Sequence, residues 1–330
     1  MCRPSGVPDD PSSADYFDPA VKCCSYVPSL PNFLAGRILS DDSPEAAFGL
    51  QTVRERIAAK VGISPLGMSP SPVYSALYQL AEDGFGKNRN MRCPHYVADG
   101  GRCGIWRNRE STCWTWFCKH VRGRVARTFW IESLLPLLKT VERELSQWCL
   151  LELGWSGAVL KETVDSSAWR GEAEEMTPEA IDGKVPDAVY RRLWGDWVGR
   201  EAEFYMECAR LVDPLSWDEV VSITGPDVRA RAKLTVDAYR ALCSDRIPAT
   251  LRPGSLRIIK LDVATTRVAT YSTYDPVDIP NVVVDVIRSF DGRPTSDVQE
   301  GIQREYGVTI EDSLIRKLYD FDLLVEYGGS

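Results

Sequence analysis

The chain has 330 residues, of which 44% are hydrophobic and 26% are charged, and its formal net charge is −8. This composition is ordinary for a globular protein and excludes a disordered or fibrous chain. The length allows two or three domains with well-buried cores. No apolar run is long enough to span a bilayer, so we expect no membrane association.

The pattern of apolar residues predicts a mainly α-helical protein in four parts. Residues 1–20 are rich in Pro, Ser and Asp and lack an apolar core, so we expect a flexible tail and no secretion signal. Residues 21–153 are predicted to form a cysteine-cluster, metal-binding domain, residues 154–250 a helical region, and residues 251–330 a small α/β module. The expected compartment is the cytoplasm, where thiols stay reduced.

Start and stop signals place the helices of the first three parts. Proline at the first helical position and glycine at the end predict helices from Pro44 to Gly62 and from Pro72 to Gly84. Residues 127–153 read as one long amphipathic helix, which Pro136 should kink or divide. Further helices are expected over residues 186–211, 217–223 and 226–243.

The C-terminal part changes character. Residues 255–263 and 266–274 alternate between apolar and polar, as strands do, and predict a hairpin with its turn near residues 264–266. Three short helical patterns follow, and then a short strand of sequence LLVEY. The predicted helices span residues 280–290, 295–306 and 310–321.

The most specific stretch is 92–123, RCPHYVADGGRCGIWRNRESTCWTWFCKHVRG, which holds four cysteines in the pattern C-x9-C-x9-C-x4-C. Both histidines of the chain also lie there, and a further thiol pair lies upstream. The six candidate metal ligands are Cys23, Cys24, Cys93, Cys103, Cys113 and Cys118, with His95 and His120 as reserve ligands or as hydrogen-bond donors to a cluster sulfur.

Soft thiolates favour zinc and iron–sulfur centres. Two alternatives remain, disulfides and inert buried thiols. Disulfides are rare in the cytosol, and the polar, Gly-rich turn between Cys93 and Cys103 does not suit a hydrophobic core. The inert alternative fits Cys149, Cys208 and Cys243 better, because each lies in an apolar helical pattern. Four thiolates complete one closed centre, so two of the six could be spare, catalytic or part of a second site.

Residues 87–127 contain ten Lys or Arg against two acidic residues. Such cations would offset the negative charge of gathered thiolates and lower thiol pKa. Tryptophans at 106, 114, 116 and 130 interleave with the arginines. They could wall a metal off from water or, alternatively, stack on single-stranded nucleic acid or a nucleotide.

The run Cys103-Gly-Ile-Trp-Arg-Asn-Arg109, followed by Cys113-x4-Cys118, resembles the YkgJ-type cysteine-cluster family, described as zinc- or iron-chelating. The resemblance covers roughly residues 20–125 and implies that the six cysteines bind metal. The chain departs from the family pattern at Glu110 and Phe117, which replace prolines, and it keeps only the final pair of the N-terminal cysteine run.

The cluster region is also distantly similar to that of flagellin lysine N-methylases, thought to hold an iron–sulfur centre. This similarity implies modification of a peptide or protein substrate. The sequence shows no glycine-rich S-adenosylmethionine fingerprint and no CxxxCxxC motif, and it indicates no catalytic residue.

The order of strands and three helices in residues 251–330 resembles winged-helix modules of the PqqD type, which bind leader peptides at a strand edge. Residues 274–330 hold twelve acidic against five basic residues, which disfavours DNA because phosphate binding needs a positive surface. We therefore expect a peptide or protein partner, bound by strand addition; the alternative is a purely structural module.

Three functional hypotheses follow. The first is an iron–sulfur protein that acts in the modification of a peptide or protein. The second is a non-enzymatic scaffold stabilised by zinc, and the third is an adaptor that responds to redox state or metal. Colour separates the first two, because iron–sulfur proteins are brown and zinc–thiolate is colourless. The sequence specifies no oligomeric state.

Overall fold

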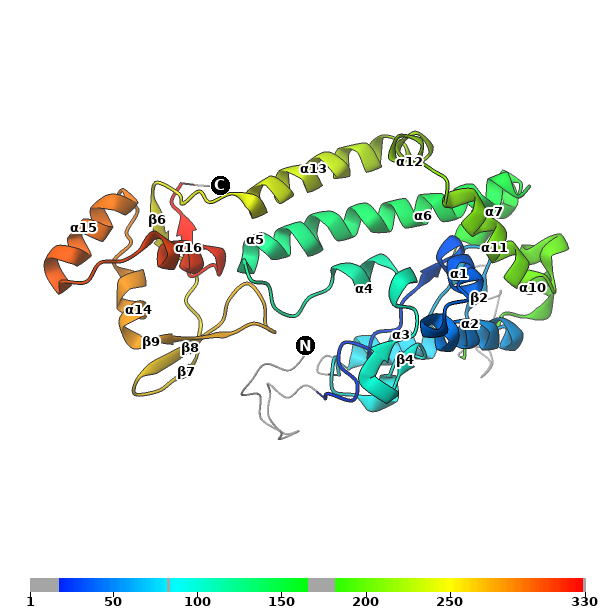
Figure 1. Cartoon of the computed structure of the whole chain (residues 1–330), viewed down its shortest axis with the longest axis horizontal. Helices are drawn as coiled ribbons and strands as arrows, with labels where there is room; N and C mark the ends of the chain where they lie inside the picture. Colours follow the sequence, from blue (N-terminus) through cyan, green and yellow to red (C-terminus); the bar gives the residue numbers. More distant parts are fainter. Residues whose placement is uncertain (1–17, 82–83, 166–181, 329–330) are drawn as a thin grey trace. The chain divides into compact units, whose positions relative to one another are not determined.

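The computed structural model describes residues 18–81, 84–165 and 182–328 (Figure 1). The fold is mainly helical with small sheets, as the sequence predicts. Most of the predicted N-terminal tail, residues 1–17, lies outside the described residues. Among the described helices, none is both long and apolar enough to cross a membrane.

Contacts divide the chain into two compact units that interleave along the sequence. Unit 1 comprises the chain up to Trp114 together with Leu138–Val228, and unit 2 comprises Thr115–Leu137 together with Arg229–Ser330. The units therefore join segments that the sequence analysis had assigned to different parts. In particular, residues 115–137 cluster with the C-terminal module.

Unit 1 is built from helices and three very short strands in a sheet of order β1-β3-β2. The strands are β1 (Leu30–Pro31), β2 (Ile63–Ser64) and β3 (Gly67–Met68). A separate pair is formed by β4 (Tyr96–Val97) and β5 (Arg102–Cys103). The main helices are α1 (Asn32–Ser40), α2 (Ala47–Ala59), α3 (Pro72–Leu80), α7 (Gly157–Val164), α10 (Asp187–Trp194), α11 (Glu201–Val212) and α12 (Trp217–Thr224).

The core of unit 1 forms where α1 packs on α11. Gly36 lets the helices approach closely, because a Cβ at this position would lie 1.8 Å from the backbone oxygen of Tyr205. Trp194, Phe204 and Tyr205 are fully buried beside this contact. Burying a large aromatic side chain contributes on the order of 2–3 kcal/mol, so this aromatic cluster stabilises the frame that carries the cysteine loops.

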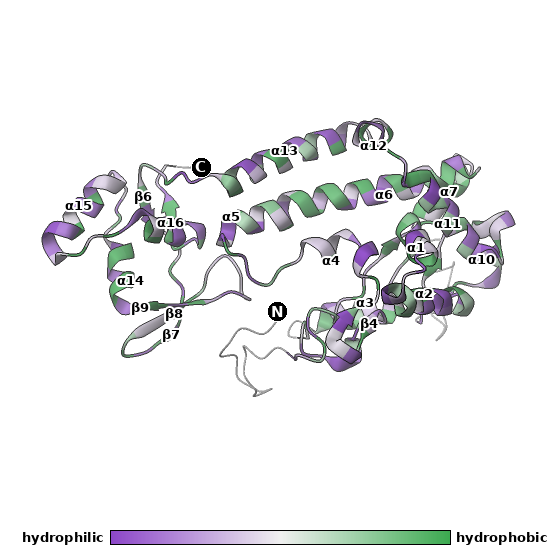
Figure 2. Ribbon diagram, viewed as in Figure 1, coloured by the Kyte–Doolittle hydropathy of each residue, from purple (hydrophilic) through white to green (hydrophobic). Residues whose placement is uncertain are grey.

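Unit 2 contains a three-stranded antiparallel sheet followed by three helices. The sheet has the order β7-β8-β9, with β7 (Ile258–Leu261), β8 (Thr265–Val268) and β9 (Val277–Pro280). The helices are α14 (Asn281–Arg288), α15 (Thr295–Tyr306) and α16 (Asp312–Asp320), and β10 (Leu324–Glu326) pairs with β6 (Leu251–Pro253). Apolar and hydrophilic residues are interspersed along these helices (Figure 2), as amphipathic helices require.

The long helix predicted over residues 127–153 runs without a gap from Gly123 to Glu152, with a π-helical segment before Pro136, where the sequence predicted a kink or a division. It consists of α5 (Gly123–Arg127), the π-helical segment η5 (Thr128–Leu134) and α6 (Leu135–Glu152). A proline inside a helix removes one hydrogen bond and crowds the preceding turn. The wider π turns lie directly before Pro136, where this crowding must be relieved.

Two other helix predictions were wrong in their bounds. The helix predicted over residues 186–211 is two helices, α10 and α11, separated by a 3-10 turn, and Gly195 and Gly199 there have positive φ. The helix predicted to run from Pro44 to Gly62 ends at Ala59, because Lys60 already adopts the left-handed conformation (φ 53°). Helix α13 (Pro226–Cys243) has its predicted bounds.

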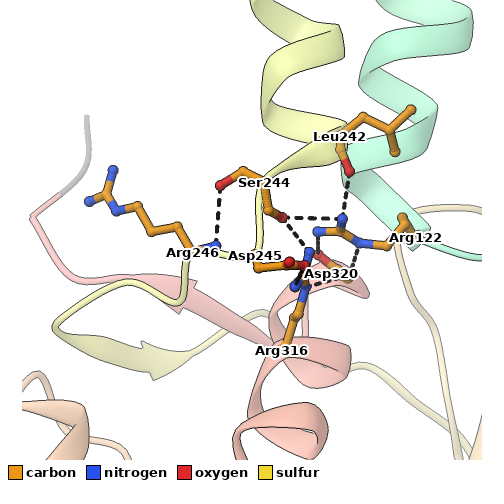
Figure 3. A network of polar contacts seen from close by, with 7 residues as sticks. All are labelled: Arg122, Leu242, Ser244, Asp245, Arg246, Arg316 and Asp320. Atoms are coloured by element: carbon orange, nitrogen blue, oxygen red, sulfur yellow. Dashed lines mark hydrogen bonds and ion pairs between the residues drawn. The ribbon is translucent and has the colours of Figure 1, made fainter.

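A network of charged side chains joins the two segments of unit 2 (Figure 3). Arg122, just before α5, binds both carboxylate oxygens of Asp320 at the end of α16, at 2.5 and 3.0 Å. The same guanidinium donates to the backbone oxygen of Leu242 in α13. Arg316 binds Asp245 and the backbone oxygen of Ser244. Residues 115–137 are thereby fastened to the C-terminal module.

Candidate metal centre

Five of the six predicted cysteine ligands gather in unit 1. Their electrostatic interactions connect three chain segments: the turn that carries Cys23 and Cys24, the β4–β5 loop, and the start of α4 (Ser111–Thr115). The negative charge of an ionised Cys23 raises the pKa of Cys93, Cys103 and Cys113. All five are thiols rather than disulfides.

Backbone hydrogen bonds fasten these segments to one another. The N–H of Cys93 donates to the backbone oxygen of Cys24 at 2.6 Å, and Lys22 Nζ donates to the oxygen of Gly101 at 2.7 Å. Tyr26 interacts electrostatically with Glu110 and Cys113. The Cys23–Cys24 turn is therefore fastened to the loop that carries Cys93 and Cys103.

Two turns present backbone N–H groups to sulfur. The N–H of His95 donates to the sulfur of Cys93, and the N–H of Ile105 donates to the sulfur of Cys103. The two turns are joined by β4–β5 pairing and by the Gly104 N–H, which donates to the His95 oxygen at 2.8 Å. N–H donors stabilise the thiolate form of cysteine, which is the form that binds metal.

Helix α2 supports these turns at close range. Gly49 lies so near the turn that a Cβ there would sit 2.3 Å from the Gly104 oxygen. A glycine at this position thus allows the backbone of α2 to touch the Cys103 turn. Three residues further, the Thr52 hydroxyl reaches the ring of His95 at 2.7 Å.

Arg109 is the cation of the centre. Its guanidinium interacts electrostatically with Cys23, Cys24, Cys103 and Cys113. Its Cζ lies 3.5 Å from the ring centroid of Trp106 and 4.4 Å from that of Trp114. Burial lowers the pKa of Arg109, although the neighbouring thiols act in the opposite direction. A cation held against aromatic rings in this way can offset the charge of nearby thiolates.

The thiols differ in how readily they ionise. A hydrogen bond from the Cys24 thiol lowers the pKa of Cys23 to about 6, against the effect of burial. Burial raises the pKa of Cys93 to about 12, and it also raises the pKa of Cys103 and of Cys113. Burying several thiolates together is unfavourable without a cation. A metal ion is the cation that such a set of ligands accommodates.

The side chains do not form a closed coordination site. Among the described residues, no three His, Cys, Asp or Glu side chains form a group that could hold a metal ion. Hydrogen bonds join the Cys23–Cys24 turn to the loop of Cys93 and Cys103, and metal binding would require these residues to rearrange. Metal binding commonly completes local folding in this way.

Cys118 and His120 belong to unit 2, whereas the other five candidate cysteines belong to unit 1. The backbone N–H of His120 donates to the hydroxyl of Tyr271 at 2.9 Å, and Tyr271 in turn bonds Asp275. Lys119 forms an ion pair with Asp275 at 3.5 Å. The segment that carries Cys118 is thus attached to the C-terminal module of unit 2.

The remaining cysteines behave largely as predicted. Cys149 and Cys208 are fully buried, and the Cys149 sulfur lies 3.8 Å from the Cys208 backbone oxygen. Cys243 is exposed near the end of α13, so the interpretation of this residue as a buried core thiol was wrong. Its helix is amphipathic, and the position falls on the solvent side.

Sequence reasoning missed several residues that support the centre. Glu110, noted only as a departure from the family pattern, is 1% exposed and accepts hydrogen bonds from the N–H groups of Thr112 and Cys113 at 2.9 and 3.2 Å. Thr52 and Arg56 on α2 were assigned no role. Because α2 is far from the cysteines in sequence, the sequence did not indicate that Thr52 and Arg56 lie near them.

A surface pocket of about 390 Å³ lies beside the His95 turn. Thr52 and Pro94 belong to its wall, so the pocket lies next to the turn that holds Cys93. The lining residues are Phe48, Gln51, Thr52, Glu55, Arg56, Ala59, Val61 and Pro94.

Compared with known proteins, the chain matches no protein-family model, no curated protein and no solved structure. The YkgJ-type, methylase-like and PqqD-like resemblances therefore rest on the sequence motifs themselves.

Proposed function

We propose that the chain is a metal-binding protein whose thiolate centre is formed in unit 1 by Cys23, Cys24, Cys93, Cys103 and Cys113. The observation that carries this proposal is the hydrogen bonding that joins the Cys23–Cys24 turn to the loop of Cys93 and Cys103, together with the electrostatic interaction of Arg109 with thiols of three segments. An arginine that lies against two tryptophan rings and interacts electrostatically with four thiols has no evident role in a core of inert cysteines. Cys118 of unit 2 is the sixth candidate ligand.

The donor set fits an iron–sulfur cluster, and zinc is the alternative. Both are held by four thiolates, so the five thiols of unit 1 provide enough ligands for one closed centre. N–H donors to Cys93 and Cys103 suit either metal, because hydrogen bonds to sulfur stabilise thiolate ligands and tune a cluster potential. When bound, an iron–sulfur cluster supplies electron transfer or Lewis-acid chemistry, whereas zinc bound by four thiolates supplies stability alone.

The chain's own residues would hold and shield the centre. The thiols would bind the metal, Arg109 would balance the thiolate charge, and Trp106 and Trp114 would cover that cation. Both tryptophans are partly exposed, at 61% and 46%. They therefore also offer an outer surface on which a partner could approach the centre.

The deciding experiment is metal and acid-labile sulfide analysis with a visible spectrum, on protein purified without air. Brown protein that contains iron and sulfide supports the iron–sulfur centre. Colourless protein with one zinc per chain supports the zinc-stabilised scaffold. Protein that contains neither metal, and that binds neither on reconstitution, contradicts the proposal.

We further propose that unit 2 is a winged-helix-like module that binds an extended peptide, the substrate or partner of the metal centre. The order of a three-stranded sheet, three helices and the β6–β10 pair supports this proposal. Strand β7 lies at the edge of its sheet with all four residues exposed. An exposed edge presents unpaired backbone groups that an added strand can satisfy.

Charge indicates the kind of peptide. Twelve acidic residues against five basic ones between Tyr274 and Ser330 favour a peptide with basic residues. Exposed apolar side chains on β7, such as Ile259 (53% exposed) and Leu261 (69% exposed), favour a peptide that also carries apolar residues. The alternatives are an adaptor that responds to redox state or metal and a purely structural module.

Peptide display against the full chain tests this second proposal. Selected peptides should be extended, basic and apolar, and Ile259→Glu should abolish their binding. Val308→Glu, at a residue that is also about half exposed, should leave binding unchanged. Equal binding by both variants would place the peptide elsewhere or exclude this role.

A further inference from the structure

We propose that unit 1 carries a binding surface for single-stranded nucleic acid, formed by Trp106, Trp114 and the basic side chains beside them. The inference goes beyond the metal-binding proposal and requires no bound metal. It is carried by two exposed tryptophan rings that one arginine holds in place, and by exposed cations that have no carboxylate partner among the described residues.

Arg109 holds both tryptophan rings. Its guanidinium carbon lies 3.5 Å from the ring centroid of Trp106 and 4.4 Å from that of Trp114. Its Nε also donates a hydrogen bond to the Trp106 backbone oxygen at 3.1 Å. Cation–π contacts of this kind attract the cation to the ring face and so restrain an exposed ring. Rings that are already restrained lose little conformational entropy when a ligand stacks on them.

Both rings nevertheless remain open to solvent. Trp106 is 61% exposed and Trp114 is 46% exposed, although tryptophan is among the side chains that gain most from burial. Two large aromatic rings exposed at one place indicate a contact surface for a partner. Arg109 covers part of each ring, so the remaining ring area is available for stacking.

The turns that carry the rings are fixed from within unit 1. Trp106 begins the 3-10 turn η4 (Trp106–Asn108), and the residue directly before it, Ile105, is buried in the core. Trp114 lies on α4, two of whose N–H groups are bound by the buried Glu110 carboxylate. The fold therefore positions both rings before any partner binds.

The surface beside the rings is basic. Residues 100–109 contain three arginines and no acidic residue, and two of these arginines, Arg102 and Arg107, have exposed side chains. Neither forms an ion pair with a carboxylate in the part of the chain that the structure describes, although Arg107 acts electrostatically on Asp41. Unpaired cations on an exposed surface attract an anionic partner.

Lys22 extends this basic surface towards the turn of Cys23. Its Nζ donates to the backbone oxygen of Gly101, directly before Arg102, at 2.7 Å. Lys22 and Arg109 also both act electrostatically on Cys23, so the two cations approach the same residue. The basic side chains therefore lie on connected turns next to the tryptophan pair.

Single-stranded nucleic acid fits both features of this surface. Each nucleotide offers a base whose π face can stack on tryptophan and a phosphate that can pair with lysine or arginine. The bases of a duplex are stacked on one another, so they do not present their faces to such rings. An acidic protein would satisfy the cations but would not bring a planar group with every negative charge.

Fluorescence anisotropy of labelled oligonucleotides, titrated with the full chain, tests the inference. We expect the wild type to bind oligo(U) RNA and oligo(dT) DNA of about 12 nucleotides, a length within the site sizes of single-strand-binding proteins. A duplex of the same length should bind more weakly. Added salt should weaken the binding, because the released counterions then return to the phosphates less unfavourably.

Tryptophan variants test the stacking. Trp106→Ala should weaken binding by about 5–150-fold, the effect expected when one base loses its stacking partner. Trp106→Phe should retain most of the affinity, because phenylalanine still offers a ring. Trp217→Ala is the matched control, since Trp217 is 50% exposed on α12 of the same unit, and it should leave binding unchanged.

Arginine variants test the charge. Arg107→Gln should weaken binding and reduce the slope of log affinity against log salt concentration by about 1, as loss of one phosphate contact does. Arg191→Gln, at an exposed arginine on α10 of unit 1, should change neither the affinity nor the slope.

A wild type that binds neither single strand at low salt overturns the inference. Equal binding of the duplex also overturns it, as does unchanged binding by both Trp106→Ala and Arg107→Gln. Polyglutamate that binds more tightly than the oligonucleotides and displaces them would assign the surface to an acidic protein instead. Metal content is measured separately on the same protein, so failure of the metal-binding proposal remains distinguishable from failure of this one.

Discussion

The carboxylate of Glu110 accepts a hydrogen bond from the backbone N–H of Cys113 at 3.2 Å and forms an ion pair with Lys139 at 3.5 Å. Glu110 therefore caps the start of α4 and fixes the backbone that carries one of the thiols. The proline expected here from the family pattern would supply no such acceptor.

Glu110→Ala should destabilise unit 1 by about 1–2 kcal/mol, the usual cost of losing a helix cap. The loss should be larger than for a surface pair because Glu110 is 1% exposed. Chemical denaturation, followed by tryptophan fluorescence, measures the difference. The control is Glu203→Ala, which removes an exposed pair with Arg200 and should not change stability measurably. Equal stability of Glu110→Ala and wild type would contradict the capping role.

Arg122→Lys should destabilise unit 2 by about 2–4 kcal/mol. Lysine cannot bind both oxygens of Asp320 and reach the Leu242 oxygen at once, and Asp320 is buried, so it would be left poorly paired. Thermal unfolding should report the loss. Arg246→Lys is the control, because Arg246 pairs with Glu326 at the surface. If the two variants unfold alike, the network in Figure 3 contributes no more than a surface pair.

Glu142 should make stability depend on pH in an unusual direction. Its carboxylate accepts hydrogen bonds from Ser111 at 2.8 Å, but burial raises the pKa of Glu142 to about 7. In the unfolded chain the ordinary glutamate pKa is about 4.3. Between these values the folded protein holds a proton that the unfolded chain has released, so the contribution of this residue is full below pH 4 and is lost as the pH rises through 7.

Glu142→Gln removes this titration. The free energy of unfolding of the variant, measured relative to wild type, should therefore rise as the pH increases from about 4.5 to 7.5. Urea denaturation at several pH values provides the measurement. A difference between the two proteins that stays constant with pH would show that Glu142 is ionised in the folded chain throughout this range.

Helix bounds were predictable where local chemistry alone sets them. Thr295–Tyr306 has its predicted ends because Gly307 adopts the left-handed conformation (φ 67°) that stops a helix. Pro72 starts its helix after Ser71, whose side chain accepts from the Tyr74 N–H. The strand β9 was missed because only four residues form it and two of them are Asp278 and Pro280, which disfavour strands.

The sequence indicated candidate ligands but not the residues that surround them. The spacing of Cys93, Cys103 and Cys113 predicts that they bind one metal, and this stays a prediction. Contacts from Thr52 and Arg56 depend on how α2 packs on the loop, which no local pattern encodes. The assignment of Cys118 to unit 2 depends likewise on the hydrogen bond between His120 and Tyr271, residues 151 positions apart.

Replacement of single cysteines tests the ligand assignment as a whole. Cys93→Ser should lose bound metal and destabilise unit 1, because the free energy of metal binding contributes directly to folding. Cys118→Ser should also lose metal if Cys118 is one of the ligands. Metal content of the purified proteins, together with thermal unfolding, gives both readouts.

Cys243→Ser is the matched control, because its thiol is exposed and far in sequence from the cluster. It should retain full metal content and an unchanged Tm. Cys149→Ser and Cys208→Ser should keep their metal but lose stability, since a buried sulfur is replaced by a hydroxyl that needs a hydrogen bond. Normal metal content in both Cys93→Ser and Cys118→Ser would exclude these thiols as ligands. Metal loss in any of the three control variants would place the centre elsewhere in the chain.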